Sequence, residues 1–134
     1  MHTGLGTLPR RYAVLLAVCL AVVIWFGLTI WQNNTTFDEW RSQLFDYPVP
    51  EGAVAVDSGS RFGHYEGNGK HCDGEAWLLL RGVDEEAALT HYEGVHGNLS
   101  VETEQPPDDS HAELVRVTIH EMYLTEHAYD PRCW

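Results

Sequence analysis

The chain has 134 residues, with 20 Asp or Glu against 8 Lys or Arg, and a formal net charge of −12 at pH 7. Arg10 and Arg11 precede every acidic residue, so the rest of the chain has 20 acidic groups against the other 6 basic ones. Nucleic-acid binding needs clustered cations, and these six are spread singly among carboxylates. We therefore expect no nucleic-acid partner.

The most apolar part of the chain covers residues 12–30. As a helix this stretch rises about 28 Å, close to the thickness of a bilayer's hydrocarbon core. Arg10 and Arg11 stand before it and Trp31 after it, a pattern typical of an anchor whose basic side stays in the cytoplasm. The sequence thus predicts a single-pass protein of the cell membrane. Its parts are a cytoplasmic N-terminus at 1–11, a transmembrane anchor at 12–31, a juxtamembrane helix at 32–47 and one extracytoplasmic domain at 48–134.

A signal peptide that is cleaved off is the competing interpretation of the same stretch. Such a signal has about 7–15 apolar residues before a site of small residues, whereas residues 27–32 are mostly bulky. An uncleaved anchor is therefore favoured. Cys19 lies in a segment that loosely matches a lipoprotein box, but Val18 occupies a position that should be small, so we expect Cys19 to face lipid.

Residues 36–45 have the pattern of a short separate helix. Thr36 is placed to cap it, and Phe37, Trp40 and Leu44 recur on one face. The aromatic residues could pack on the domain or rest among lipid headgroups, and both interpretations stay open. The prolines that follow end the helix.

The part of the chain after the anchor, residues 32–134, has about a hundred residues and suffices for one small domain. Alternation of apolar and polar residues, together with continuous apolar runs, predicts four strands. A helix is predicted between the second and the third strand, because Asp84 can cap it and acidic residues occupy its first turn. This order favours an α+β fold, with an antiparallel or mixed sheet and a packed helix. The predicted strands cover residues 53–58, 75–81, 99–104 and 114–120, the helix covers 84–92, and turns are expected at 57–60 and 105–110.

Cys72 and Cys133 are the strongest chemical feature of this domain. Outside the cytoplasm two cysteines usually form a disulfide, which here would close a loop of about 60 residues and contribute about 4 kcal/mol. One alternative is a metal thiolate site that uses His71 and Cys72 with a histidine that approaches in the fold, from among His64, His111, His120 and His127. Free reactive thiols are the other. No standard zinc spacing is present, so no metal site and no cofactor are predicted.

Residues 61–74 form a glycine-rich loop between the first two predicted strands. A phosphate loop would need glycine at His64 and Ser or Thr at His71, so that pattern fails. We expect Gly67, Gly69 and Gly74 to supply turns of positive φ instead. The best polar contacts for a ligand are nevertheless offered here, by Tyr65, Lys70, His71 and Asp73.

No catalytic residues are predicted from the remaining motifs. The acidic pair at 85–86 suits the positive end of a helix, the pair at 108–109 suits a solvated turn, and no serine has the frame of a nucleophile elbow. A non-catalytic binding or structural module of the cell envelope, with a protein partner there, is the favoured function. The alternative is a metal-binding or enzymatic domain that uses His71, Cys72 and Asp73.

Three segments together resemble a known group of proteins: Pro48 with residues 50–52, residues 67–73, and residues 84–92. The sequence resembles the uncharacterised small membrane-anchored or lipoprotein-like extracytoplasmic domains of actinobacteria. The resemblance covers about half of the outer domain. It implies an extracytoplasmic location and a pairing of Cys72 with Cys133, and it transfers no activity. This chain departs from the group by Gly74, where an aromatic residue often stands, and by lacking a clear lipid-attachment box.

Overall fold

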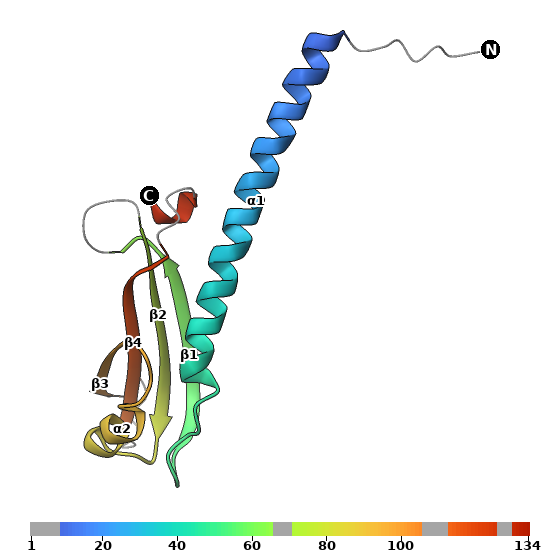
Figure 1. Ribbon diagram of the computed structural model, residues 1–134. Coiled ribbons are helices and arrows are strands. Elements are labelled where there is room, and N and C mark those ends of the chain that lie inside the picture. Colours follow the sequence, from blue (N-terminus) through green and yellow to red (C-terminus); the bar gives the residue numbers. More distant parts are fainter. Residues whose placement is uncertain (1–8, 66–70, 106–112, 126–129) are drawn as a thin grey trace, which may run out of the picture.

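The computed structural model describes residues 9–65, 71–105, 113–125 and 130–134. They form one long helix and a small α+β domain, which confirms the predicted fold class (Figure 1). The sheet is antiparallel, with strand order β1-β2-β4-β3. The elements are helix α1 (Arg10–Phe45), strand β1 (Val54–Gly63), strand β2 (Cys72–Arg81), helix α2 (Glu85–Tyr92), strand β3 (Asn98–Glu104), strand β4 (Leu114–Thr125) and a 3-10 turn (Pro131–Cys133).

Helix α1 runs without a break from the apolar segment into the domain, so no second helix begins at Thr36. The polar residues at the expected break have partners that leave the helical backbone intact. The hydroxyl of Thr35 donates to the carbonyl of Trp31, and the side chains of Asn33 and Asn34 bond to the C-terminal segment. Because these side chains do not compete for the backbone amides ahead of them, the helix continues.

The half of α1 nearer its C-terminal end is docked on the domain. Five of its residues are buried, at spacings of three and four that place them on one face of a helix. We call them the docking stripe: Thr29, Asn33, Phe37, Trp40 and Leu44. They pack mainly on β2 and β4, so the sheet fixes the direction of the helix.

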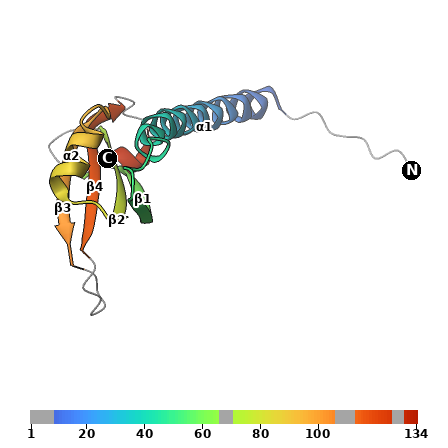
Figure 2. The ribbon, with the colours of Figure 1, turned by 90° about the horizontal axis from the view of Figure 1, so that it is seen from below.

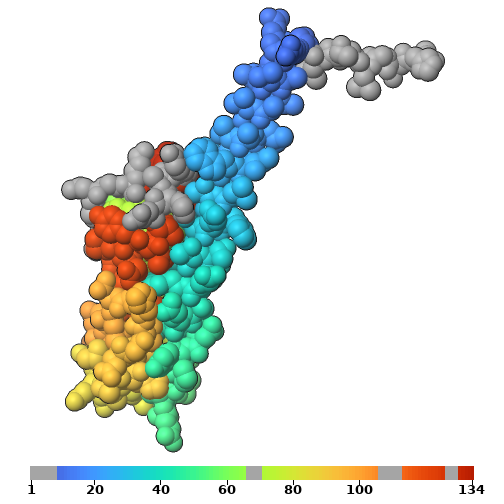
Figure 3. Space-filling view, viewed as in Figure 1, coloured from blue at the N-terminus to red at the C-terminus, as the bar shows by residue number. Residues whose placement is uncertain are grey.

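The other half of α1 projects away from the domain (Figure 3). It is long and apolar enough to cross a membrane, and very little of it is buried. A signal sequence near an N-terminus has the same properties. Among the described residues there is therefore one candidate membrane-spanning segment, which is consistent with membrane association.

Both helices cover the same face of the sheet (Figure 2). Alternate residues of β2 and β4 point to this face, as the period of two in a strand requires. Ala76, Leu78 and Leu80 come from β2, and Val115 and Val117 from β4. The resulting core joins the sheet to both helices, so α1 is a part of the domain as well as a candidate anchor.

The first hairpin is longer than the sequence indicates. Residues 57–60, expected to be a turn, lie inside β1, where Gly59 pairs with Trp77 of β2. Gly74, expected to have positive φ, lies inside β2. A Cβ on Gly74 would stand 2.7 Å from Leu124 and 3.0 Å from Trp40. The absence of a side chain at Gly74 therefore lets α1 pack closely on β2. Residues 57–60 are extended, although their sequence is typical of a turn, because they pair with the long apolar strand β2.

Helix α2 has the predicted cap, and its removal gives a first testable prediction. The Asp84 carboxylate accepts the backbone N–H of Ala87 at 2.8 Å. Asp84→Ala should lower the free energy of unfolding by about 1 kcal/mol, because an amide at the helix start loses its partner. Chemical denaturation followed by circular dichroism measures the change. Asp84→Asn keeps an acceptor and is the control; a loss as large in this variant would show that the cap is not the cause.

Candidate functional site at the disulfide-bonded end of the sheet

A disulfide joins Cys72 at the start of β2 to Cys133 near the C-terminus. Both residues are fully buried, and their Cα atoms lie 4.7 Å apart. The bond holds the C-terminal turn at the end of the sheet from which the apolar half of α1 projects (Figure 1). The sulfur of Cys72 is thus engaged in a covalent bond, which removes it from the ligand set of a metal thiolate site.

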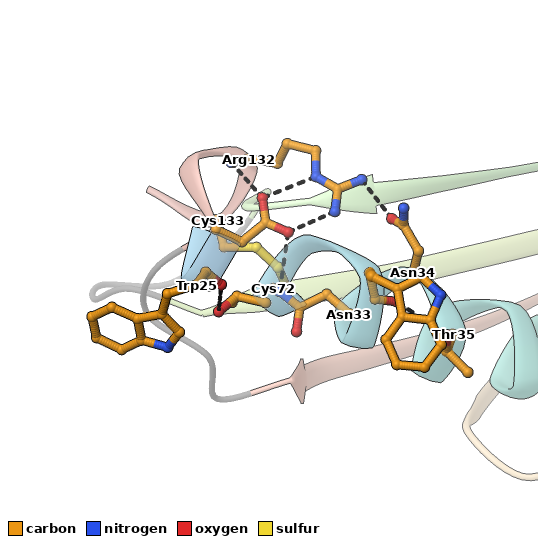
Figure 4. Close-up of polar contacts among 10 residues, drawn as sticks. Trp25, Asn33, Asn34, Thr35, Cys72, Arg132 and Cys133 are labelled. Carbon is orange, nitrogen blue, oxygen red and sulfur yellow. Dashed lines mark hydrogen bonds and ion pairs between the residues drawn. A yellow bond between two sulfur atoms is a disulfide. The ribbon is translucent and has the colours of Figure 1, made fainter. Parts of the chain in front are cut away.

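A buried carboxylate, Asp130, links this turn to α1. Its Oδ1 accepts Nε of Arg132 at 2.9 Å, and its Oδ2 accepts Nη2 of the same guanidinium at 2.6 Å. Nδ2 of Asn33 in the docking stripe donates to Oδ2 at 3.0 Å, and Nη1 of Arg132 donates to Asn34 at 2.9 Å. Figure 4 shows Asn33, Arg132 and the disulfide converging at this point. Asp130 and Arg132 therefore bind α1 by hydrogen bonds and hold it against this end of the sheet.

The same contacts stabilise the charge on Asp130. The Arg132 guanidinium, with help from Asn33, lowers the pKa of the Asp130 carboxyl to about 2, although burial opposes this shift. Asp130 has no exposed surface, so solvent screens its pair with Arg132 less than it would a surface pair. The ionised carboxylate is the form that the folded protein favours.

This lowered pKa predicts a loss of stability in acid. The Asp130 contribution is present above the ordinary carboxyl pKa and is lost as the pH falls from about 4 through about 2. We expect its size to be roughly 2 kcal/mol. Urea denaturation between pH 5 and pH 2 should show a steeper fall for the unsubstituted protein than for Asp130→Asn, which cannot titrate there. Parallel curves for the two proteins would contradict the prediction.

A second cluster lies beside the disulfide. His71 and Asp73 flank Cys72, and side chains two residues apart in an extended chain point to the same side while the residue between points to the other. This alternation sends Cys72 to its disulfide partner and brings His71 and Asp73 together, with Nε2 of His71 3.3 Å from Oδ1 of Asp73. His64, which directly follows β1 and lies across the hairpin from His71, completes the group. We call His64, His71 and Asp73 the histidine–aspartate cluster.

The Asp73 carboxylate also holds two backbone amides. Its Oδ2 accepts the N–H of Tyr65 at 3.0 Å, and its Oδ1 accepts the N–H of Tyr123 at 3.3 Å. Asp73 is completely buried and His71 is 1% exposed. The pKa of the neighbouring Tyr65 hydroxyl is raised, mainly by burial. Asp73 therefore organises the polar end of the hairpin.

Strand β4 has an irregularity opposite this cluster. Cys72 pairs with Thr125 and Gly74 with Glu121, so β4 uses more residues than β2 over the same distance. Tyr123, inside this bulge, has φ of 59°, a left-handed conformation that is uncommon for a residue other than glycine. Its ring centroid lies 4.1 Å from that of His71. Bulges and strained residues are frequent beside functional sites, and here both face the buried histidine.

The structure brings together most of the residues that the sequence singles out. Tyr65, His71 and Asp73 meet at this end of the sheet, whereas Lys70, His111 and His127 lie outside the described residues. Sequence reasoning named His64 only as one of four histidines that could approach a metal, and it missed Asp130 as a member of the site. Their partners are far along the chain or across a hairpin, and the only local signal is the Asp-Pro-Arg start of the C-terminal turn.

The fold and the site define a class of architecture: a small disulfide-containing α+β domain docked on one long, partly apolar helix. Comparisons with protein-family models, with curated proteins and with solved structures return no match for this chain. Its function is therefore argued from its own contacts.

Proposed function

We propose that this is a single-pass membrane protein whose acidic domain is held against the outer face of the membrane as a non-catalytic module of the cell envelope. The docking stripe is the observation that carries the proposal. It begins at Thr29, inside the apolar segment, and continues to Leu44 in the domain core. The candidate anchor and the domain share one continuous helix, and this continuity supports a domain that stands directly at the membrane.

The stripe also supports retention of the apolar segment. Cleavage near residue 31 would remove Thr29 and would leave Asn33, which is fully buried and bonded to Asp130, at a frayed end. Arg10 and Arg11 favour a cytoplasmic N-terminus, and the disulfide favours an oxidising compartment for the domain. The resemblance to actinobacterial extracytoplasmic domains agrees with this orientation.

The structural roles of the polar groups support a non-catalytic module. Asp84 caps α2, Asp130 clamps α1, and Arg61 pairs with Glu75 across the first hairpin. A protein partner in the envelope would find an accessible surface on β1. This strand lies at an edge of the sheet and exposes Val54 and Val56, whose side chains are 61% and 41% exposed.

The mass of the mature protein tests the anchor. Protein extracted from membranes with detergent should have the mass of the complete chain, and a protease added outside intact cells should remove only the domain. A mature N-terminus beyond residue 31, or a domain protected from the outside protease, would contradict the proposal.

Photo-crosslinking in membranes tests the partner. A photoreactive residue at Val56 should form an adduct with another envelope protein, because this side chain is accessible on the edge strand. Leu89 of α2 is also 48% exposed and is the matched control position. Equal adducts from both positions would show that capture is unspecific.

A further inference from the structure

The histidine–aspartate cluster brings three ligand atoms close together. One nitrogen each from His64 and His71 and one carboxylate oxygen of Asp73 all lie within 4.8 Å of one another. A zinc ion binds imidazole nitrogen and carboxylate oxygen at about 2.0–2.2 Å, so modest rotation of side chains closes this triangle around an ion. His64, the least buried of the three, is the residue with room to adjust.

Hydrogen bonds around the cluster hold Asp73 and His64 in position, as the surrounding contacts of metal ligands do. The backbone N–H groups of Tyr65 and Tyr123 hold the carboxylate of Asp73. The backbone N–H of His64 donates to the carbonyl of Arg132 at 3.0 Å, beside the disulfide. Hydrogen bonds of this kind orient the ligands of metal sites before the ion arrives.

His64 provides an independent indication of a bound group. Its Nδ1 is buried and has no hydrogen-bond partner among the described residues. Buried polar atoms are nearly always satisfied, because an unmet nitrogen costs free energy. If Nδ1 of His64 binds an ion, it gains the partner that it lacks. If the other ring nitrogen binds the ion, the ring turns and Nδ1 can reach a new partner. The ring centroids of His64 and His71 are already only 4.6 Å apart.

We propose that His64, His71 and Asp73 bind one divalent transition-metal ion, with Zn²⁺ the ion that this donor set fits best. Two imidazoles and one carboxylate are borderline ligands that suit zinc better than calcium or magnesium, which prefer oxygen alone. Three protein ligands leave a fourth position for water. The disulfide supplies no ligand, and its role is to hold the first hairpin and the C-terminal turn in register around the ion.

Zinc binding by the full-length protein tests this proposal. The protein carries Cys19→Ser, because Cys19 is a free and exposed thiol that would bind zinc by itself. It is kept in detergent without reductant, stripped with a chelator and titrated with Zn²⁺ alone by calorimetry. We expect one ion per chain, a higher melting temperature with zinc, and the same stoichiometry by native mass spectrometry.

Two variants and one control locate the site. His64→Ala and Asp73→Asn should each weaken zinc binding by roughly 10–100-fold or more. His120, a partly buried histidine that pairs with Glu75 further along the sheet, is the matched control, and His120→Ala should bind as the unsubstituted protein does. Should Asp73→Asn fail to fold, His64→Ala decides, because that side chain is only partly buried. Absence of stoichiometric zinc, or undiminished binding by His64→Ala, would overturn the proposal.

Discussion

Replacing Cys72 and Cys133 with serine is expected to lower the free energy of unfolding by about 4 kcal/mol. The two residues are separated by 61 positions, and a link across a loop of that length removes much of the freedom of the unfolded chain. The loss approaches the whole stability of a small domain. The folded protein would also lose its hold on the C-terminal turn, so the contacts of Asp130 with α1 should weaken with it.

Urea denaturation of the full-length protein in detergent measures this effect. Unsubstituted protein treated with reductant should behave like the double serine variant, because both lack the same bond. Cys19→Ser is the control, since this cysteine is exposed and unpaired and its replacement should leave the midpoint unchanged. A double variant as stable as the parent would show that the disulfide adds nothing to the folded state.

Trp40→Ala is expected to cost about 3–5 kcal/mol, the range for an aromatic side chain removed from a packed core. Trp40 is 4% exposed, stacks with Phe37 at 6.0 Å between ring centroids, and rests against Gly74 of β2. Its removal opens a cavity between α1 and the sheet. The variant should therefore have a lower free energy of unfolding, and α1 should be held less firmly against the sheet.

Trp31→Ala is the matched control on the same helix. Trp31 is 63% exposed, so its removal creates no cavity in the domain. Denaturation followed by circular dichroism gives the stability of both variants. Hydrogen exchange of residues 33–45 reports on docking: faster exchange is expected in Trp40→Ala alone. Equal destabilisation by the two substitutions would mean that α1 is not docked through this face.

Sequence alone predicts those elements whose causes are local. Helix α2 follows from the cap at Asp84, and β2 from an unbroken apolar run, because neighbouring residues suffice to define each. The fold class follows from their order. The face of α1 that carries Phe37, Trp40 and Leu44 is likewise visible as a periodic pattern.

The continuity of α1 and most of the candidate site depend on contacts between distant residues. The sequence predicts a separate helix that starts at Thr36, whereas in the structure the side chain of Asn33 donates to Asp130, almost a hundred positions later, and the helix continues. In the bulge of β4, the backbone N–H of Tyr123 donates to Asp73 on another strand. His64 joins His71 only through closure of a hairpin. No local sequence pattern indicates these three contacts, so they could not be predicted from the sequence.

Because α1 is unbroken, the number of residues in it determines how far the domain lies from the apolar segment and which way the domain faces. Each residue of an α-helix advances the chain by about 1.5 Å and rotates it by about 100°. Since α1 continues through Thr29 without a joint, the number of residues before the docking stripe alone sets which way the sheet faces around the apolar segment and how far from it the domain stands. One residue inserted at Gly27 would swing the domain through more than a quarter turn and leave every contact inside it unchanged.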